Sequence, residues 1–580
     1  MSTTTAFPKI TASAVQAGQL AHVARDTAPD NPAPGTELLR AALLNPQDSS
    51  SADGFRVMPP LGLGYLASVA RAHGFHVDIF DFAAAERLDE ESLIRCGLLE
   101  YEVYGISSYT ETFTDAVKLA RLLRRRRPDA LIVLGGYHAS SAAEHVLADV
   151  PEIDVLVRRE GEEAFTRILQ ARFAGAPLAD IPGTVTRSAA GEIVEGAPAS
   201  GLLSLDELPL PALDVKFGPE KYYHFTHAGR HEIKETLGIV SSRGCPKRCT
   251  FCSIVVLSPK WRARSVESLM NEVRYRYERK PFRHITFQDA NFFVYPPRTL
   301  EFARRLYAFD PDITWSGTAT ADTIVQHAGI LSEIARLNCA YLEVGIESGN
   351  ARSLARFNKR TTVDDNCQAL RLLREAGIDI GLDFIMFEPE MMFEDLVENV
   401  EFLYRNELFG YWPADHLFSD LRLYPDTPVR AAYEMRLGQP FAPHSLPSVP
   451  YADEVIQAAA ACMHYYQEKA QTVTDQLFKS LSASVNQLLF TDRQALEKNP
   501  ALVHLCQRAQ ETIVKLRHLP YTFLCDLLGR AEALRAGRSP QQMIERIDWP
   551  EERKIWEEAF GVLGLLSRPP AEAGERERPS

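Results

Sequence analysis

The residues most clearly able to do chemistry are three cysteines of the segment Ser241–Ser253, which reads SSRGCPKRCTFCS. Cys245, Cys249 and Cys252 are spaced C-x3-C-x2-C and follow a short apolar run that favours a buried strand. Such spacing allows one loop to wrap an iron–sulfur cubane and to give three thiolates to three irons, which leaves the fourth iron open. A structural zinc site would normally use four ligands, and no fourth Cys or His lies near this loop. The triplet therefore indicates a cluster with one open iron; a zinc site and a chance triplet are the alternatives.

Two later segments place polar side chains directly after apolar runs. ITFQDANFF brings Gln288 and Asp289 to the end of its run, and YLEVGIESGN brings Glu347 and Ser348 to the end of its own. A charged residue just past a buried barrel strand indicates a functional site. The alternative is structural for all four, because such residues also cap strand ends and favour turns.

The elements that must position these residues are strands that alternate with helical patterns such as Val266–Arg279 and Val363–Ala376. The strands are expected at Leu237–Ser241, His284–Phe287, Ile313–Thr318, Tyr341–Gly345, Ile380–Met386 and His416–Leu423. Six such units predict a partial (β/α)6 barrel of the TIM type, with its chemistry at the carboxyl ends of the strands.

From Leu237 to Pro428 the sequence resembles the radical S-adenosylmethionine (SAM) superfamily, through the cysteine loop, the two strand-end segments, LARFNKRTT and LRLYPDTPV. In that family the triplet ligates a [4Fe–4S] cluster whose open iron binds the amino and carboxylate groups of SAM. An electron from the cluster cleaves SAM to methionine and a 5′-deoxyadenosyl radical. The fifth strand departs from the common pattern, because FIMFEPEMMFED lacks the Gly that many members have before the loop Pro. The residues that the resemblance places near SAM are Phe251, Gln288, Asp289, Glu347 and Ser348.

An earlier series of strands and helices occupies the N-terminal part of the chain. Its strands are expected at Leu38–Leu44, Val77–Phe80, Val103–Ser107, Leu131–Leu134 and Val155–Val157, followed by a small hairpin around Gly191. This alternation predicts a doubly wound, Rossmann-like parallel sheet, which binds ligands beyond the carboxyl ends of its strands.

Three segments fall at those carboxyl ends: MPPLGLGYLA, GISSYTET and LGGYHAS. None is G-x-G-x-x-G, so a dinucleotide is poorly supported. Together with VRREGEEAF and LDELPLPALD, they resemble the cobalamin-binding domain fused to many radical SAM enzymes. The D-x-H-x-x-G segment of mutases is absent, so we expect cobalamin to bind base-off without a histidine from that motif. The alternatives are a sheet that has lost cobalamin and, for His138, an ordinary loop residue. The residues implied to contact cobalamin are Pro59, Leu61, Gly62, Ser107, Ser108, Gly135, Gly136 and His138.

Net charge, apolar runs and cysteine usage restrict the cellular compartment and the kinds of partner that we expect. The net charge of -14 argues against a nucleic-acid partner, and no stretch approaches the ~20 apolar residues of a membrane span. No signal pattern is present, so we expect a cytoplasmic protein without a membrane partner. The nine cysteines are mostly scattered and odd in number, which is not a disulfide framework.

The domain organisation follows from these patterns. We expect a disordered leader at 1–35, a cobalamin-binding domain at 36–200, a linker at 201–232, a radical SAM domain at 233–440, a helical C-terminal domain at 441–565 and a disordered tail at 566–580.

The resemblance implies an enzyme that uses a [4Fe–4S] cluster, SAM and cobalamin. The leading hypothesis is a methyltransferase that methylates an unactivated carbon of a biosynthetic intermediate through the 5′-deoxyadenosyl radical and methylcobalamin. The alternatives are a cyclase, rearrangement or oxidation enzyme with the same cofactors, a tRNA methylthiotransferase and a non-catalytic cobalamin sensor. The N-terminal part holds only Cys96, not the extra cysteine trio of methylthiotransferases. The expected partners are a small-molecule or peptide substrate and an external electron donor such as flavodoxin or ferredoxin; the residues that act in catalysis stay unassigned.

Overall fold

The computed structural model describes residues 39–46, 59–83, 89–188, 190–199, 203–218, 225–227, 231–233, 236–491, 499–530 and 549–566. The predicted leader and, except for Leu566, the predicted tail lie outside this range. In the described residues, no helix is long and apolar enough to cross a membrane. The chain divides into two compact units. The first unit comprises residues 1–224, 235–318 and 423–447, and the second comprises 225–234, 319–422 and 448–580.

The N-terminal sheet of the first unit has the strand order β7-β6-β5-β4-β3-β1-β2-β8. Strands β1 to β5 and β8 run parallel to one another, and the predicted hairpin adds β6 and β7, with β6 antiparallel to β5 and β7 antiparallel to β6. The strands are β1 (Arg40–Asn45), β2 (His76–Asp81), β3 (Val103–Ser107), β4 (Leu131–Gly135), β5 (Val155–Val157), β6 (Thr184–Arg187), β7 (Ile193–Glu195) and β8 (Val215–Phe217). Because β1 lies between β2 and β3, the order in which strands are added reverses at β1, and this switch point is where such sheets bind ligands.

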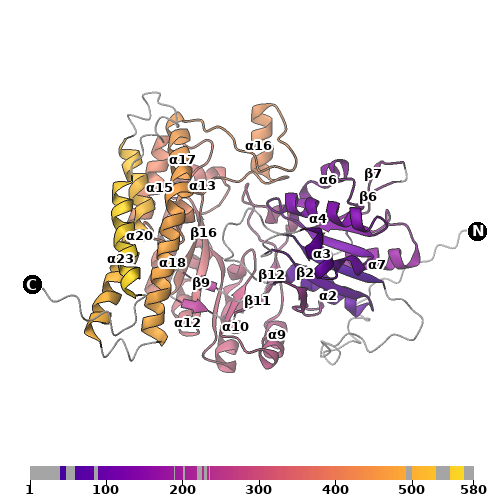
Figure 1. Ribbon diagram of the computed structural model, residues 1–580, viewed down its shortest axis with the longest axis horizontal. Coiled ribbons are helices and arrows are strands. Elements are labelled where there is room, and N and C mark those ends of the chain that lie inside the picture. The colour runs from indigo at the N-terminus through magenta and orange to yellow at the C-terminus, as the bar shows by residue number, and fades with distance from the viewer. Residues whose placement is uncertain are drawn as a thin grey trace, which may run out of the picture. The chain divides into compact units, whose positions relative to one another are not determined.

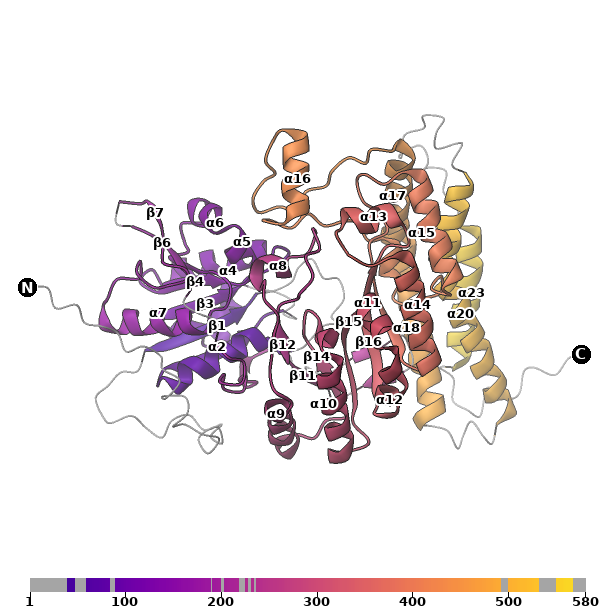
Figure 2. The same ribbon diagram turned by 180° about the vertical axis from the view of Figure 1, so that it is seen from behind.

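Helices cover both faces of this sheet, as Figures 1 and 2 show. Alternate strand residues such as Leu44 and Ile106 pack with α4 and α6, whereas Leu43 and Val133 pack with α2 and α7. The helices are α2 (Leu61–Ala72), α3 (Glu90–Arg95), α4 (Phe113–Arg126), α5 (Tyr137–Ser141), α6 (Ala143–Asp149) and α7 (Glu162–Ala174). The two-residue period of the strands thus supplies two separate cores and confirms the doubly wound prediction.

The first unit also holds the opening strands of the barrel. Strands β11, β14 and β15 are parallel neighbours in that order, and a short antiparallel pair, β12 and β13, flanks the cysteine loop. These strands are β11 (Thr236–Ile239), β12 (Ser242–Arg243), β13 (Arg262–Ala263), β14 (His284–Phe287) and β15 (Thr314–Thr320). The helices are α8 (Ile254–Leu257), α9 (Val266–Arg279), α10 (Pro296–Phe309) and, after the barrel, α16 (Pro428–Leu437).

The second unit continues the alternation with two long parallel strands, β16 (Cys339–Glu347) and β17 (Asp379–Phe384). A capping box between Thr362 and Asp365 starts α14, the predicted helix Val363–Ala376. The other helices of this region are α11 (Ala321–Gln326), α12 (Leu331–Arg336), α13 (Ala351–Arg356) and α15 (Phe393–Arg405). A separate two-stranded sheet consists of β9 (Phe225–His227) and β10 (His231–Ile233).

The predicted sixth strand is only partly regular. Its first residues belong to a short 3-10 helix, Ala414–Leu417. The segment then makes one isolated parallel β-bridge, between Asp420 and Phe387, which lies three residues beyond the end of β17. The backbone N–H of Leu421 donates to the carbonyl of Phe387 at 2.8 Å. Pro413, which starts the turn, has no N–H for a ladder and so favours the turn over a longer strand.

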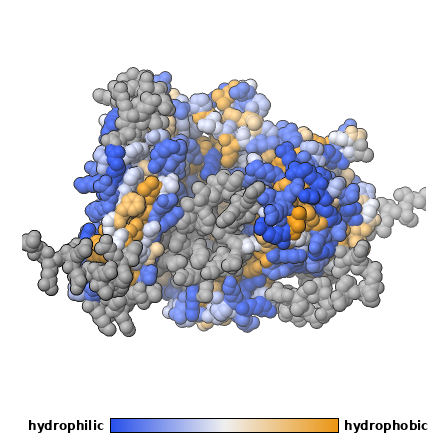
Figure 3. Space-filling view, viewed as in Figure 1, coloured by the Kyte–Doolittle hydropathy of each residue, from blue (hydrophilic) through white to orange (hydrophobic). Residues whose placement is uncertain are grey.

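The C-terminal region is helical, as predicted. Two short π-helical segments, Gln467–Gln471 and Gln487–Thr491, follow α17 and α18. The α-helices are α17 (Glu454–Tyr466), α18 (Thr472–Asn486), α20 (Pro500–Gly529) and α23 (Pro550–Leu566). Helices α18, α20 and α23 pack against one another. On the face shown in Figure 3, apolar side chains also appear on the surface at this end; Val514 and Phe560 are exposed.

The predicted linker has more structure than a simple connection. Val215–Phe217 adds edge strand β8 beside β2, and Ala212 donates its N–H to the carbonyl of Gly64 in α2 at 3.0 Å. The linker therefore docks on the N-terminal sheet and its helix.

Candidate functional site

The cysteine loop follows β12 in the first unit. Gly244 starts it with φ +80°, and a Cβ there would lie 2.3 Å from the carbonyl oxygen of Lys260, so only glycine fits. Cys249 is buried, Cys245 and Cys252 are half-buried, and none of the nine cysteines forms a disulfide. Among the described residues, no three His, Cys, Asp or Glu side chains converge on one metal position. In a cubane each thiolate binds its own iron, so one loop that carries three cysteines can supply the three protein ligands.

Asp289 anchors the base of the loop. Its carboxylate accepts hydrogen bonds from the backbone N–H of Ser241 at 2.7 Å and from the hydroxyls of Ser241 and Ser242. Burial raises the pKa of Asp289, and the serine hydrogen bonds oppose this shift. The side chain thus ties the end of β14 to the residues just before the cysteines. Gln288 is exposed, and Phe251 is half-buried within the loop.

Glu347 and Ser348 end β16 in the second unit. Glu347 has φ +64°, which is uncommon for a residue with a side chain and is often found at functional sites. Its carboxylate pairs with the Lys359 ammonium at 2.7 Å, and both side chains are buried. The Ser348 hydroxyl donates to Asn399 at 2.8 Å. Lys359 comes from the family-like segment LARFNKRTT, and its role as the partner of Glu347 was not evident from the sequence.

A carboxylate from β17 faces the same cluster. The Asp383 side chain is exposed by surface area, but crowding by the surrounding protein atoms, together with repulsion from Glu343 and Glu347, raises the pKa of its carboxyl above the usual range. Carboxylate oxygens accept hydrogen bonds from hydroxyl and ammonium groups. The region of Glu343, Glu347 and Asp383 can therefore hold hydroxyl or ammonium groups.

The cobalamin candidates of the N-terminal sheet lie at the carboxyl ends of their strands. Ser108, after β3, donates its N–H to the carbonyl of Gly135, at the end of β4, at 2.9 Å. Gly136 has φ +98°, and a Cβ there would lie 2.6 Å from the Ser108 carbonyl oxygen. The two loops are thus bonded together, and Gly136 is required by that close approach. Ser107 is half-buried beside them.

The turn before α2 contributes the remaining candidates. Pro59 and Leu61 are buried, whereas Gly62 is exposed and has open space around its Cα. Met58, which belongs to the same sequence segment, lies outside the described residues. Gly62 is the position of this turn that a large ligand could approach closely.

His138 is completely buried and engaged at both ring nitrogens. Nδ1 lies 3.2 Å from the Thr110 hydroxyl, and Nε2 lies 3.0 Å from Nδ1 of His444, which in turn contacts Asp149. Burial, with the nearby His444 and Arg430, lowers the pKa of His138 to about 3. A ring nitrogen could therefore reach a metal only if one of these hydrogen bonds broke.

An ion-pair network connects the N-terminal domain to the cysteine loop. Arg243, two residues before Cys245, pairs with Glu160 at 3.0 Å and with Glu162 at 2.5 Å. Arg262 of β13 also pairs with Glu160. Both glutamates belong to VRREGEEAF, so this segment holds the strands that flank the cysteines.

The two candidate cofactor regions adjoin within the first unit. Helix α8, directly after Cys252, contacts α5, directly after Gly136. The segment after the barrel closes the same region: Tyr137 donates its hydroxyl to the carbonyl of Pro425 at 2.6 Å, and Val429 donates its N–H to the carbonyl of Thr250 at 3.0 Å. The cysteine loop and the loop of Gly135 and Gly136 can therefore contribute to one site.

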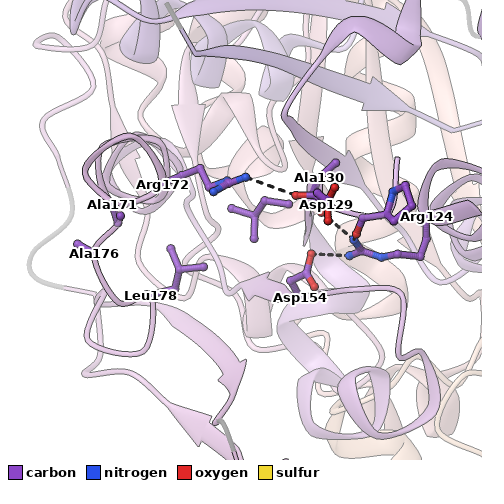
Figure 4. A pocket seen from close by; sticks show the side chains of 11 residues that line it. Arg124, Asp129, Ala130, Asp154, Ala171, Arg172, Ala176 and Leu178 are labelled. Atoms are coloured by element: carbon purple, nitrogen blue, oxygen red, sulfur yellow. Dashed lines mark hydrogen bonds and ion pairs between the residues drawn. The ribbon is translucent and has the colours of Figure 1, made fainter. Parts of the chain in front are cut away.

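A pocket of about 430 Å³ opens elsewhere on the first unit (Figure 4). It lies where β4 and β5 begin. Arg124 and Asp154, which both line it, form an ion pair at 2.6 Å. Because it is at the amino ends of the strands, it is separate from the candidate cofactor loops.

Comparisons with known proteins match both halves of this description. The B12 binding domain model matches residues 55–169, and the Radical SAM superfamily model matches residues 239–403. These segments contain the three N-terminal loops and the cysteine triplet.

Individual relatives extend the comparison. An uncharacterized methyltransferase of Pyrococcus horikoshii, PH0819, is 26% identical over 346 residues, which cover 59% of this chain and 72% of the relative. The anaerobic magnesium-protoporphyrin IX monomethyl ester cyclase of Rubrivivax gelatinosus is 24% identical over 379 residues, which cover 63% of this chain and 66% of the cyclase. The fold matches that of the cobalamin-dependent SAM radical enzyme OxsB, solved with aqua-cobalamin and SAM, with TM-score 0.64 and 16% identity over 92% of this chain and 85% of OxsB.

Proposed function

Because the chain belongs to the radical SAM enzymes that carry a B12-binding domain, we propose that it is a cobalamin-dependent methyltransferase acting on an unactivated carbon of a biosynthetic intermediate. When bound, the cofactors supply reductive cleavage of SAM, hydrogen abstraction and methyl donation. The observation that carries the proposal is the contact between α5 and α8 within one compact unit. Two cofactors that act in turn on one carbon must both reach the same substrate. The contact between α5 and α8 supports this arrangement, because it brings the two candidate cofactor loops close together.

The roles of individual residues are part of the proposal. Cys245, Cys249 and Cys252 ligate the cluster, and Phe251 lies beside SAM. Glu347 and Ser348 bind the polar groups of SAM, whereas Asp289 acts mainly by holding Ser241 and Ser242 at the base of the loop. Gln288 stays a candidate SAM contact. The cobalamin contacts are proposed at Pro59, Leu61, Gly62, Ser107, Ser108, Gly135, Gly136 and His138, with His138 positioning its loop and not ligating cobalt.

The test of methylation is the stoichiometry of the SAM products. Reconstituted enzyme is incubated with SAM deuterated at its methyl group and with a metabolite extract from a strain that lacks the gene and so accumulates the substrate. Methylation at an unactivated carbon should release 5′-deoxyadenosine and S-adenosylhomocysteine in near-equal amounts and should give a product with the labelled methyl. Turnover that releases 5′-deoxyadenosine and an unlabelled product would refute methyl transfer and would leave the radical SAM assignment standing.

A second candidate is ring closure without methyl transfer, which the similarity to the Rubrivivax cyclase favours. It predicts 5′-deoxyadenosine without matching S-adenosylhomocysteine. The same assay therefore separates the two candidates.

We further propose that an external donor such as flavodoxin or ferredoxin reduces the cluster in the cytoplasm and docks beside the cysteine loop. Arg248 and Lys260 are exposed next to this loop, although the chain as a whole carries a net charge of -14. A local positive surface steers an acidic donor. Lys260→Glu should slow reduction by flavodoxin at low salt but leave reduction by dithionite unchanged, whereas Lys118→Glu in α4 should affect neither. Equal rates for Lys260→Glu and the unchanged enzyme would exclude this docking surface.

A further inference from the structure

Asn291 lies where the end of β14 meets the cysteine loop. Its side chain is 2% exposed, and its amide nitrogen Nδ2 lies 3.8 Å from the sulfur of Cys245. Sulfur is a large, diffuse acceptor, so this separation is within the range of an N–H···S hydrogen bond. The contact joins residues 46 positions apart in the chain.

The backbone on both sides of Asn291 is held by one residue of β15. Thr318 donates its hydroxyl to the carbonyl of Asp289 at 3.0 Å and accepts the N–H of Phe292 at 2.9 Å. The ring of Phe292 also stacks on Phe287, with 4.0 Å between centroids. Asn291 is thus fixed between two anchored neighbours, and its direction toward Cys245 is set by the fold.

The other end of the amide gives a second, independent observation. The oxygen Oδ1 of Asn291 is buried and has no hydrogen-bond partner. A buried acceptor that is left unsatisfied destabilises the folded protein. A buried acceptor beside a cluster ligand therefore points to a donor that arrives with the cofactors.

From these contacts we propose that Asn291 is a positioning residue for the cluster: it donates its amide N–H to the Cys245 thiolate and leaves Oδ1 to accept a hydrogen bond from a donor that arrives with the cofactors. Hydrogen bonds to the cluster sulfurs are among the factors that set its reduction potential. Reduction adds one negative charge, and an N–H dipole directed at sulfur stabilises it. Asn291 therefore raises the potential and eases electron uptake. This inference rests on the radical SAM assignment and is independent of whether the product is methylated.

The experiment is an anaerobic redox titration of the reconstituted full chain, followed by electron paramagnetic resonance, with iron content measured in parallel. Asn291→Leu removes the donor at similar volume, and Asn291→Asp replaces it by a carboxylate. Both variants should retain the iron of the unchanged protein and show a more negative midpoint, with Asp at least as negative as Leu.

A matched control is available in the second unit. Asn406 donates its amide to the sulfur of Cys367 at 3.4 Å, the same chemistry away from the cluster. Asn406→Leu should leave the midpoint unchanged. An unchanged or raised midpoint in both Asn291 variants would overturn the proposal. Loss of the cluster from both, while Asn406→Leu assembles normally, would also overturn it by showing a purely structural role.

Discussion

Adjacent glycines at the end of β4 should respond very differently to the same substitution: Gly136→Ala should destabilise the protein, and Gly135→Ala should not. Gly136 has φ +98° and ψ -168°, a region essentially restricted to glycine, where another residue costs roughly 1–3 kcal/mol. An added Cβ would also lie 2.6 Å and 3.0 Å from the Ser108 carbonyl oxygen and nitrogen. Overpacking against fixed backbone adds about 1–3 kcal/mol. Gly136→Ala should therefore destabilise the first unit by ~2–6 kcal/mol.

Gly135 provides the matched comparison. Its φ is ordinary, and a Cβ there would meet its nearest atom, the Val157 carbonyl oxygen, at 3.9 Å. Gly135→Ala should therefore leave stability within about 0.5 kcal/mol of the unchanged protein. If cobalamin approaches this turn, the bulkier Gly135→Leu should lower cobalamin retention while the protein stays folded.

The assay combines thermal unfolding of the cofactor-free protein with the visible spectrum after reconstitution with hydroxocobalamin and gel filtration. For a unit of this size, the loss at Gly136 corresponds to a fall in the unfolding midpoint of roughly 5–15 °C. A Gly136→Ala protein as stable as the original, or a Gly135→Ala protein equally destabilised, would refute the reasoning from backbone geometry. Normal cobalamin retention by Gly135→Leu would remove Gly135 from the cofactor site.

Three further predictions follow from the same unit. Changing Cys245, Cys249 and Cys252 together to Ala should abolish the iron content of about four per chain and the thiolate-to-iron absorption; retention of a full cluster would contradict the ligand assignment. Because the pKa of His138 falls to about 3 on folding, the unfolded chain alone gains this proton between pH 6.5 and 3. Stability should decrease by ~1.4 kcal/mol per pH unit as the pH falls through this window, and urea unfolding should show a shallower dependence for His138→Asn. Arg243→Met should destabilise the protein by about 3–5 kcal/mol in denaturant unfolding, since it leaves Glu162 buried without its partner; an unchanged unfolding midpoint would argue against the network.

Local patterns in the chain predicted the elements well. The helix Val266–Arg279, the strand His284–Phe287 and the strand Val103–Ser107 have their predicted bounds. Their hydrophobic periods depend only on residues within each segment, which is why the sequence determines them. The sixth barrel strand was less predictable, because apolar residues favoured a strand while Pro413 favoured a turn.

In the candidate site, too, local features were predictable from the sequence and tertiary contacts were not. The spacing of Cys245, Cys249 and Cys252 is local, because one loop can present all three thiolates whatever surrounds it. The sequence placed Asp289 at the end of its apolar run, and the family resemblance placed it near SAM. Its role as an anchor of the cysteine loop depended on Ser241 and Ser242, which only the packing of β11 against β14 brings to it.

The longest-range contacts were decided by tertiary structure alone. His138 meets His444 across 306 residues, and Asn291 meets Cys245 across 46. No spacing or composition marks these partners, because their meeting depends on strand order and on where the segment after the barrel packs. The sequence by itself thus determined the cysteine loop and the local elements, and its resemblance to known families implied the cofactor classes. The fold determined which side chains hold those loops, because partners distant along the chain are selected only when the sheets and helices have packed.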